Sequence, residues 1–192
     1  PDGSVGGIYR KIHLVPFGEY VPARHVFFFM SRIVQAVSDF SAGSTFDLLP
    51  VDGHSVSTAI CYEIVYPNLV RQFTVAGSEL LTTITNHSWF VPTWAPYQHF
   101  AQASMRAIEN GRFLVRAANT GISGIVDPYG RVLARTGIFE PDVVVGDVRL
   151  LRESTLYART GDVFAYACTV VTAVLLVMAI RSGRMKVQSR NP

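Results

Sequence analysis

Charged residues and cysteines are both scarce in this 192-residue sequence. Only 16% of the residues are charged while 49% are hydrophobic, a balance that excludes an intrinsically disordered chain. The two cysteines, Cys61 and Cys168, form no metal-binding pattern and lie in unlike settings, so we expect no disulfide framework. The basic residues behind the net charge of +3 are scattered except at the C-terminus, so we expect no nucleic-acid partner.

One long apolar run lies near the C-terminus. Residues 163–180 carry no charge and reach the length that a helix needs to span a bilayer, although a buried core helix is the alternative. The basic stretch RSGRMKVQSR at 181–190 follows, and the positive-inside tendency places that end in the cytoplasm. We therefore predict an extracytoplasmic domain at 1–160, a transmembrane helix at 161–181 and a basic cytoplasmic tail at 182–192.

The remaining pattern predicts an α/β domain, because strand-like and helical segments alternate. Alternating or β-branched residues indicate strands at 7–16, 54–60, 79–85, 112–118, 121–127 and 131–136. Helical spacing predicts helices at 24–40 and 98–110, the second ending at Gly111. Residues 41–53 are expected to form loops and turns, and DPYG at 127–130 to form a turn.

Cys61 is unusual because of what surrounds it. In STAICYEIVYP, residues 57–67, an apolar β-branched run stops at the cysteine, a carboxylate follows at Glu63, and Pro67 ends the element. A structural cysteine would usually have apolar neighbours on both sides. The pattern therefore predicts a cysteine presented at the C-terminal end of a strand.

A cysteine nucleophile needs a nearby cation or base, because the thiolate is the reactive form. We nominate Lys11, which ends a strand-like stretch just before a loop that carries Glu19. The alternative is that both are solvated surface charges. His87 and His99 lack partners at metal-ligand spacing, so we expect no metal site, and Arg116 is interpreted as holding strands and turns.

Five segments carry a further signal: YRKIHLVPFGEYVP, ICYEIVYP, TNHSWF with PYQH, RAANTGISGIVDPYGRV and TLYARTGDVF. In this order they resemble the apolipoprotein N-acyltransferase family, membrane-bound members of the nitrilase (carbon–nitrogen hydrolase) superfamily. The resemblance runs from about Tyr9 to the final apolar segment. It implies a nitrilase-like four-layer αββα sandwich, of which we expect an incomplete later half, followed by one C-terminal transmembrane helix.

The resemblance also implies roles for individual residues. Cys61 matches the nucleophile, which takes an acyl chain to form a thioester. Lys11 matches the residue that stabilises the oxyanion, beside the backbone N–H of Tyr62. Glu19 matches a second required carboxylate that supports the site.

Other positions match supporting residues of the family. Tyr62 and Glu63 match neighbours that the family needs, and Trp89 and Phe90 match an aromatic pair on a mobile loop near the substrate entrance. This loop departs from the family pattern, because Val91 stands where glycine is common and NHS replaces the more usual NDA.

The resemblance implies a phospholipid donor, preferably phosphatidylethanolamine, and a diacylglyceryl-apolipoprotein acceptor that is acylated on its α-amino group. No metal or diffusible cofactor is implied, because the donor is already an activated ester. The implied location is the bacterial plasma (inner) membrane, with the catalytic domain on the extracytoplasmic, periplasmic face.

Two alternatives stay open. The opening PDGSVGG reads as a hairpin turn, so we expect the chain to begin within a domain. The family's general-base glutamate lies well before the lysine, and no carboxylate of this chain matches it. A membrane-tethered amidase or nitrilase that hydrolyses a C–N bond is therefore one alternative, and a non-catalytic membrane-anchored fragment is the other.

Overall fold

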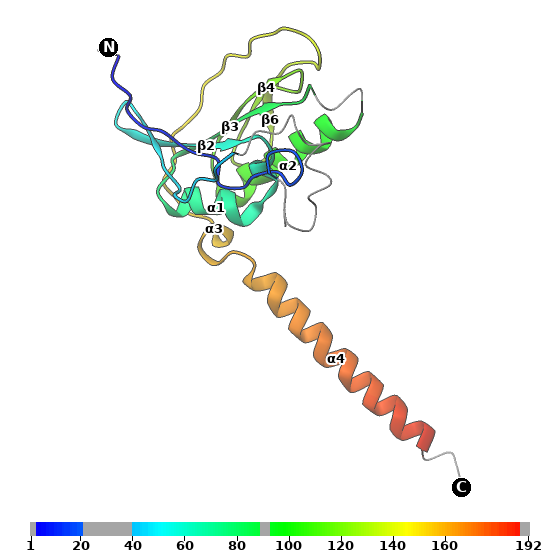
Figure 1. Cartoon of the computed structure of the whole chain (residues 1–192). Coiled ribbons are helices and arrows are strands. Elements are labelled where there is room, and N and C mark those ends of the chain that lie inside the picture. Colours follow the sequence, from blue (N-terminus) through cyan, green and yellow to red (C-terminus); the bar gives the residue numbers. More distant parts are fainter. Residues whose placement is uncertain (1–2, 21–39, 89–92, 189–192) are drawn as a thin grey trace. The chain divides into compact units, whose positions relative to one another are not determined.

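The computed structural model describes residues 3–20, 40–88 and 93–188 (Figure 1). The chain divides into two compact units, residues 1–159 and 160–192. A mixed sheet with its connecting helices makes up the first unit, and one long helix dominates the second.

Six strands form one sheet in the first unit, and they lie side by side in chain order. The strands are β1 (Leu49–Val51), β2 (His54–Ile60), β3 (Leu80–Asn86), β4 (Leu114–Asn119), β5 (Gly124–Val126) and β6 (Val132–Arg135). The central strands β2, β3 and β4 pair in parallel, and the outer pairs are antiparallel. This mixed sheet with helices between its parallel strands confirms the predicted α/β class.

Helical crossovers join the parallel strands, because a tight turn cannot connect parallel neighbours. The 3-10 helix η2 (Cys61–Val65) and the helix α1 (Pro67–Val75) connect β2 to β3, and α2 (Ala95–Asn110) connects β3 to β4. Pro67 begins α1, where its missing N–H costs no helical hydrogen bond. Gly111 ends α2 as predicted, in the left-handed conformation with φ of 61°.

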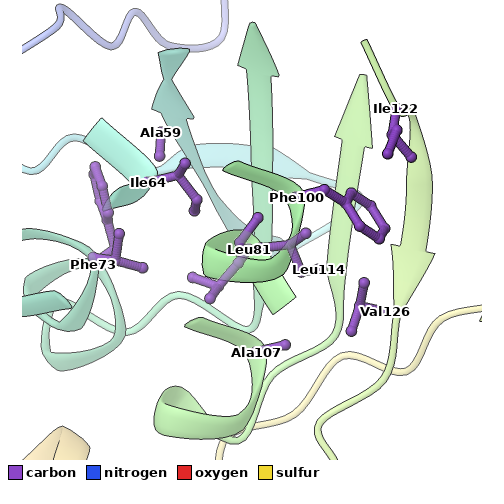
Figure 2. Close-up of a cluster of buried hydrophobic side chains, with 11 residues drawn as sticks. Ala59, Ile64, Phe73, Leu81, Phe100, Ala107, Leu114, Ile122 and Val126 are labelled. Carbon is purple, nitrogen blue, oxygen red and sulfur yellow. The ribbon is translucent and has the colours of Figure 1, made fainter. Parts of the chain in front are cut away.

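The core of the first unit is built from one face of the sheet and the helices α1 and α2 (Figure 2). Leu81 and Leu114 are paired across β3 and β4, and both are buried. On α1, Phe73 is completely buried, and its ring lies 5.3 Å from the rings of both Tyr9 and Phe46. Burial of such a side chain contributes roughly 2–3 kcal/mol to folding.

Three residues in register form one row across the parallel strands, next to this apolar core. Ala59 pairs with Thr83, and Thr83 pairs with Arg116, on β2, β3 and β4 respectively. Thr83 and Arg116 lie two residues after Leu81 and Leu114, so they point to the same helix-covered face. All three members of the row are buried, which places a charged side chain inside the core near the end of β2.

The second unit contains α4 (Val163–Gln188), a helix of 26 residues. Its segment Val163–Arg181 has a mean hydropathy of 2.5, and none of that segment is buried within the chain. By length and composition this one helix of the described residues can cross a membrane. The helix α3 (Leu156–Thr160) precedes it.

Three sequence predictions need correction or lie outside the structure. The strand predicted at 7–16 is wrong, because backbone N–H groups of this segment donate to the Glu63 carboxylate rather than to a neighbouring strand. Part of the loop expected at 41–53 forms the edge strand β1. The helix expected at 24–40 lies outside the described residues, apart from its last residue.

Candidate active site

The backbone turns sharply where β2 ends. Ile60 is the last residue of β2, and Cys61 begins η2 with a positive φ of 55°. A non-glycine residue in this left-handed region carries strain of roughly 1–2 kcal/mol, which persists only where surrounding contacts hold it. The predicted place of Cys61 at the end of a strand is confirmed, and its side chain is partly exposed.

Glu63 holds this turn against the N-terminal segment. Its side chain is 0% exposed, and Oε2 accepts a hydrogen bond of 2.7 Å from the backbone N–H of Ile60. Oε1 accepts three more, from the Tyr9 hydroxyl at 2.9 Å and from the N–H groups of Ile12 at 2.7 Å and His13 at 3.0 Å. Burial and the Glu63 charge raise the pKa of Tyr9, so its phenol stays protonated and donates.

Lys11 and Glu19 form an ion pair within the N-terminal segment. The Lys11 Nζ lies 2.6 Å from each carboxylate oxygen of Glu19, which also accepts the backbone N–H of Val15 at 2.8 Å. The Lys11 side chain is only 10% exposed, which argues against two solvated surface charges. Because Lys11 directly precedes Ile12, the pair is anchored through Glu63 to the turn at the end of β2.

A polar cluster of His87, His99 and Arg116 lies buried on the helix-covered face of the sheet. The His87 Nε2 is 2.7 Å from the His99 Nδ1. The Arg116 Nη2 lies 3.1 Å from the His99 Nδ1 and 3.3 Å from the His87 Nε2. The Arg116 Nε donates to the carbonyl of Ile122 at 3.0 Å, so the guanidinium is held from two sides.

This cluster carries one positive charge at neutral pH and interacts with Cys61. Burial and then the Arg116 charge lower the pKa of His87 to about 4 and that of His99 to about 3, so both imidazoles are neutral. The Cys61 backbone partly opposes the shift of His99. Burial lowers the pKa of Arg116 to about 10, and its electrostatic interaction with Cys61 acts in the opposite direction.

Aromatic rings line the same turn. The Tyr62 ring lies 5.7 Å from the Tyr66 ring in an edge-on arrangement and 6.2 Å from the His99 ring. The His13 ring lies 3.9 Å from that of Tyr66. Tyr62 is exposed, so the turn offers an apolar surface beside the thiol.

The structure brings most of the predicted site residues together. Cys61, Tyr62 and Glu63 are consecutive on η2, and hydrogen bonds to Glu63 connect them to the segment of Lys11 and Glu19. The predicted aromatic pair, Trp89 and Phe90, lies outside the described residues. Within the described ranges, no three histidine, cysteine or carboxylate side chains are grouped to hold a metal ion.

Sequence reasoning missed the buried cluster. Its interpretation of Arg116 accounts for the hydrogen bond to Ile122, but not for the contacts with His87 and His99. A signal was present, because His87 directly follows β3 while Arg116 lies in β4. Adjacent parallel strands bring such positions to the same end of a sheet.

Known proteins match nearly the whole chain. The family model described as carbon-nitrogen hydrolase matches residues 1–156. The apolipoprotein N-acyltransferase of Geobacter metallireducens is 44% identical over 181 residues, which cover 94% of this chain and 35% of that protein. The apolipoprotein N-acyltransferase of Bradyrhizobium diazoefficiens is 39% identical over 198 residues, covering 100% of this chain and 35% of that protein. These relatives confirm the resemblance read from the five segments, and the chain spans about a third of their length.

Solved structures share the fold of the first unit. A variant of the amidase from Nesterenkonia sp. AN1, with an acetamide moiety added covalently at its active-site cysteine, aligns with a TM-score of 0.55 at 22% identity. That alignment covers 83% of this chain and 55% of the amidase. A further amidase structure from Nesterenkonia sp. has a TM-score of 0.53 at 23% identity, and the alignment covers 83% of this chain and 54% of that amidase. With the family match, these structures confirm the predicted nitrilase-like α/β fold.

Proposed function

Because the chain belongs to the carbon–nitrogen hydrolase family, we propose that it is part of an acyltransferase that matures lipoproteins. The enzyme moves an acyl chain from a phospholipid, such as phosphatidylethanolamine, to the α-amino group of a diacylglyceryl-cysteine apolipoprotein. The observation that carries the proposal is the turn at Cys61. A partly exposed thiol in a strained backbone is anchored, through buried Glu63, to the segment of the Lys11–Glu19 pair.

The proposed reaction has two displacement steps. In the first, the Cys61 sulfur attacks the ester carbonyl, a C–S bond forms, and the lysophospholipid leaves as an alcohol that takes up the thiol proton. In the second, the amine attacks the thioester, a C–N bond forms as the C–S bond breaks, and the amine proton returns to the Cys61 sulfur. Donor and acceptor therefore use the site in turn, which suits two partners that are both embedded in a membrane.

Lys11 and the Tyr62 backbone N–H are the proposed oxyanion donors. Glu19 fixes the Lys11 ammonium with two charge-assisted hydrogen bonds, so the cation needs little reorganisation during the reaction. The Tyr62 N–H lies in the first turn of η2, where a helix leaves N–H groups without an intrahelical partner. Trp89 and Phe90 are proposed to line the substrate entrance.

The proposed placement follows from the apolar helix. Residues 1–160 form the catalytic part on the extracytoplasmic face of a bacterial plasma membrane, 161–181 cross that membrane, and 182–192 lie in the cytoplasm. The length and apolar composition of Val163–Arg181 and the basic residues after it support this arrangement. An anchor in the same chain keeps the catalytic part at the surface that holds both lipid substrates.

The proposal is tested with the full-length protein in detergent, phosphatidylethanolamine and a synthetic diacylglyceryl-cysteine lipopeptide. We expect mass spectrometry to find one added acyl chain on the α-amino group of the peptide, and none with Cys61→Ala. Release of free fatty acid without peptide acylation, or amide hydrolysis in the absence of phospholipid, would instead indicate a membrane-tethered hydrolase. No turnover of any kind by folded full-length protein would support the non-catalytic alternative.

A further inference from the structure

Arg116 is a buried cation without a carboxylate partner in the part of the chain that the structure describes. Its side chain is 2% exposed, and the ion pairs of the described residues all involve other groups. Its Nη1 is buried and has no hydrogen-bond partner in the same part of the chain. Burying a charge without a counter-ion is costly, so this guanidinium would be stabilised by an anionic group nearby.

Cys61 is the group that the geometry brings to this cation. Arg116 is in register, through Thr83, with Ala59, which lies near the end of β2 and two residues before Cys61. Arg116 interacts electrostatically with Cys61, and His99, which contacts Arg116, interacts with the Cys61 backbone.

The two imidazoles orient the guanidinium and add no competing positive charge at neutral pH. Both histidine rings are in hydrogen-bonding distance of the Arg116 Nη2, and they are 2.7 Å from one another. His87 is closely confined, because a Cβ placed on Gly121 would lie only 2.3 Å from its Nδ1. The two histidines therefore hold the Arg116 guanidinium in a fixed orientation.

A buried carboxylate also lies near Cys61 in the chain. Glu63 is two residues after Cys61, and its carboxylate accepts four hydrogen bonds. The other charged or titratable groups on the elements that meet at this turn are Tyr9, Lys11, His13, Glu19, Tyr62, Tyr66, His87, His99, Arg106 and Glu109. Of these, Lys11 is paired with Glu19 and Arg106 with Glu109.

We propose that Arg116, oriented by His99 and His87, is a positioning residue that favours the thiolate form of Cys61. The inference rests on the proposed function, which requires a reactive thiolate, and it adds a buried positive charge to the surroundings of the proposed nucleophile. It also gives a role to a group of three polar side chains buried between the sheet and α2.

The test is the rate at which iodoacetamide alkylates Cys61 in the full-length protein, followed by peptide mass spectrometry at pH 7 and pH 10. Arg116→Met is expected to lower the pH 7 rate about tenfold, because loss of a nearby opposite charge typically shifts the ionisation of a group by about one pH unit. At pH 10, above the ordinary thiol value of about 8.5, the expected change is less than about twofold. Arg116→Lys, which keeps the charge, is expected to retain most of the pH 7 rate.

Arg112→Met is the matched control. Arg112 is also 2% exposed and also buried in the first unit, but its guanidinium donates to backbone carbonyls, including that of Ser78 at 2.8 Å. Its electrostatic partners are Glu79 and Glu153 rather than Cys61. The control is therefore expected to disturb packing and leave the pH 7 alkylation rate within about twofold of wild type.

An unchanged pH 7 rate in folded Arg116→Met, or an equal loss in Arg112→Met, would overturn the inference. If Arg116→Met does not fold, as judged by its thermal transition, His99→Leu replaces it, because this change removes the imidazole beside the guanidinium. We expect His99→Leu to lower the pH 7 alkylation rate at least about threefold, which would support the inference. An unchanged alkylation rate would contradict it. Alkylation needs no lipid, so this result is separate from acylation by phospholipid, whose failure would defeat only the proposed function.

Discussion

The carboxylate of Glu63 accepts a hydrogen bond of 2.7 Å from the backbone N–H of Ile12, a residue 51 positions earlier in the chain. The Tyr9 hydroxyl and the Ile60 N–H bind the same carboxylate. A single buried side chain thus joins the N-terminal segment to the turn that presents Cys61.

Glu63→Ala is expected to lower the free energy of unfolding by about 3 kcal/mol or more, because several buried donors would lose their acceptor. Chemical denaturation of the full-length protein measures this change. Glu140→Ala, at an exposed carboxylate, serves as the control and is expected to change stability by less than about 0.5 kcal/mol. Equal stability of the two variants would show that Glu63 does not anchor the turn.

Lys11→Met is expected to reduce acyl transfer about 10²–10³-fold, the usual effect of removing one oxyanion donor. The loss should appear in the rate of thioester formation rather than in the thermal transition. Arg10→Met provides a neighbouring control, because Arg10 is exposed and lies one residue earlier. A similar loss in both variants would point to general electrostatic attraction of lipid instead of a specific role of Lys11.

Gly121→Ala is expected to destabilise the protein by about 1–3 kcal/mol, because the new Cβ would lie 2.3 Å from the His87 Nδ1 and force the histidine pair apart. Gly6→Ala is the control, since its Cβ would meet only the Pro50 Cγ at 3.5 Å. Thermal unfolding of both variants checks the prediction. A transition of Gly121→Ala that coincides with that of Gly6→Ala would contradict the packing described for His87.

Acid is expected to weaken the fold through the two buried histidines. Burial lowers the pKa of His87 to about 4 and that of His99 to about 3, whereas the unfolded chain binds protons near the ordinary value of 6.5. The unfolded state therefore holds more protons, and the free energy of unfolding falls as the pH drops from about 6.5 to about 4. Denaturation at pH 7, 6 and 5 measures the slope, which should be smaller in His99→Gln. An equal slope in wild type and variant would count against a neutral buried pair.

Local pattern predicted the strand that ends at Cys61 and the close of the helix α2. The alternating β-branched run before Cys61 predicted β2, and a glycine at the end of a periodic segment predicted the close of α2 at Gly111. These features depend on side-chain alternation and on backbone preference, both of which are local properties. The helix α1 was not predicted, since it has only nine residues and buries few apolar side chains.

Contacts between distant segments could not be predicted in the same way. Residues 7–16 have the composition of a strand, but the N–H groups of Ile12 and His13 bind a carboxylate about fifty residues away. The cluster around Arg116 likewise depends on which strands are neighbours, and no local pattern contains that information. Residue types therefore indicated Cys61 as a candidate nucleophile, whereas a prediction of its surroundings would have required the order of the strands in the sheet.

The most direct test of the account is intact mass spectrometry of the full-length protein after incubation with phosphatidylethanolamine and without an acceptor. The account predicts one added acyl mass, located on the Cys61 peptide, that hydroxylamine removes and that Cys61→Ala does not acquire. A folded wild-type protein that gains no acyl mass, or that gains one elsewhere in the chain, would contradict Cys61 as the site of a thioester intermediate.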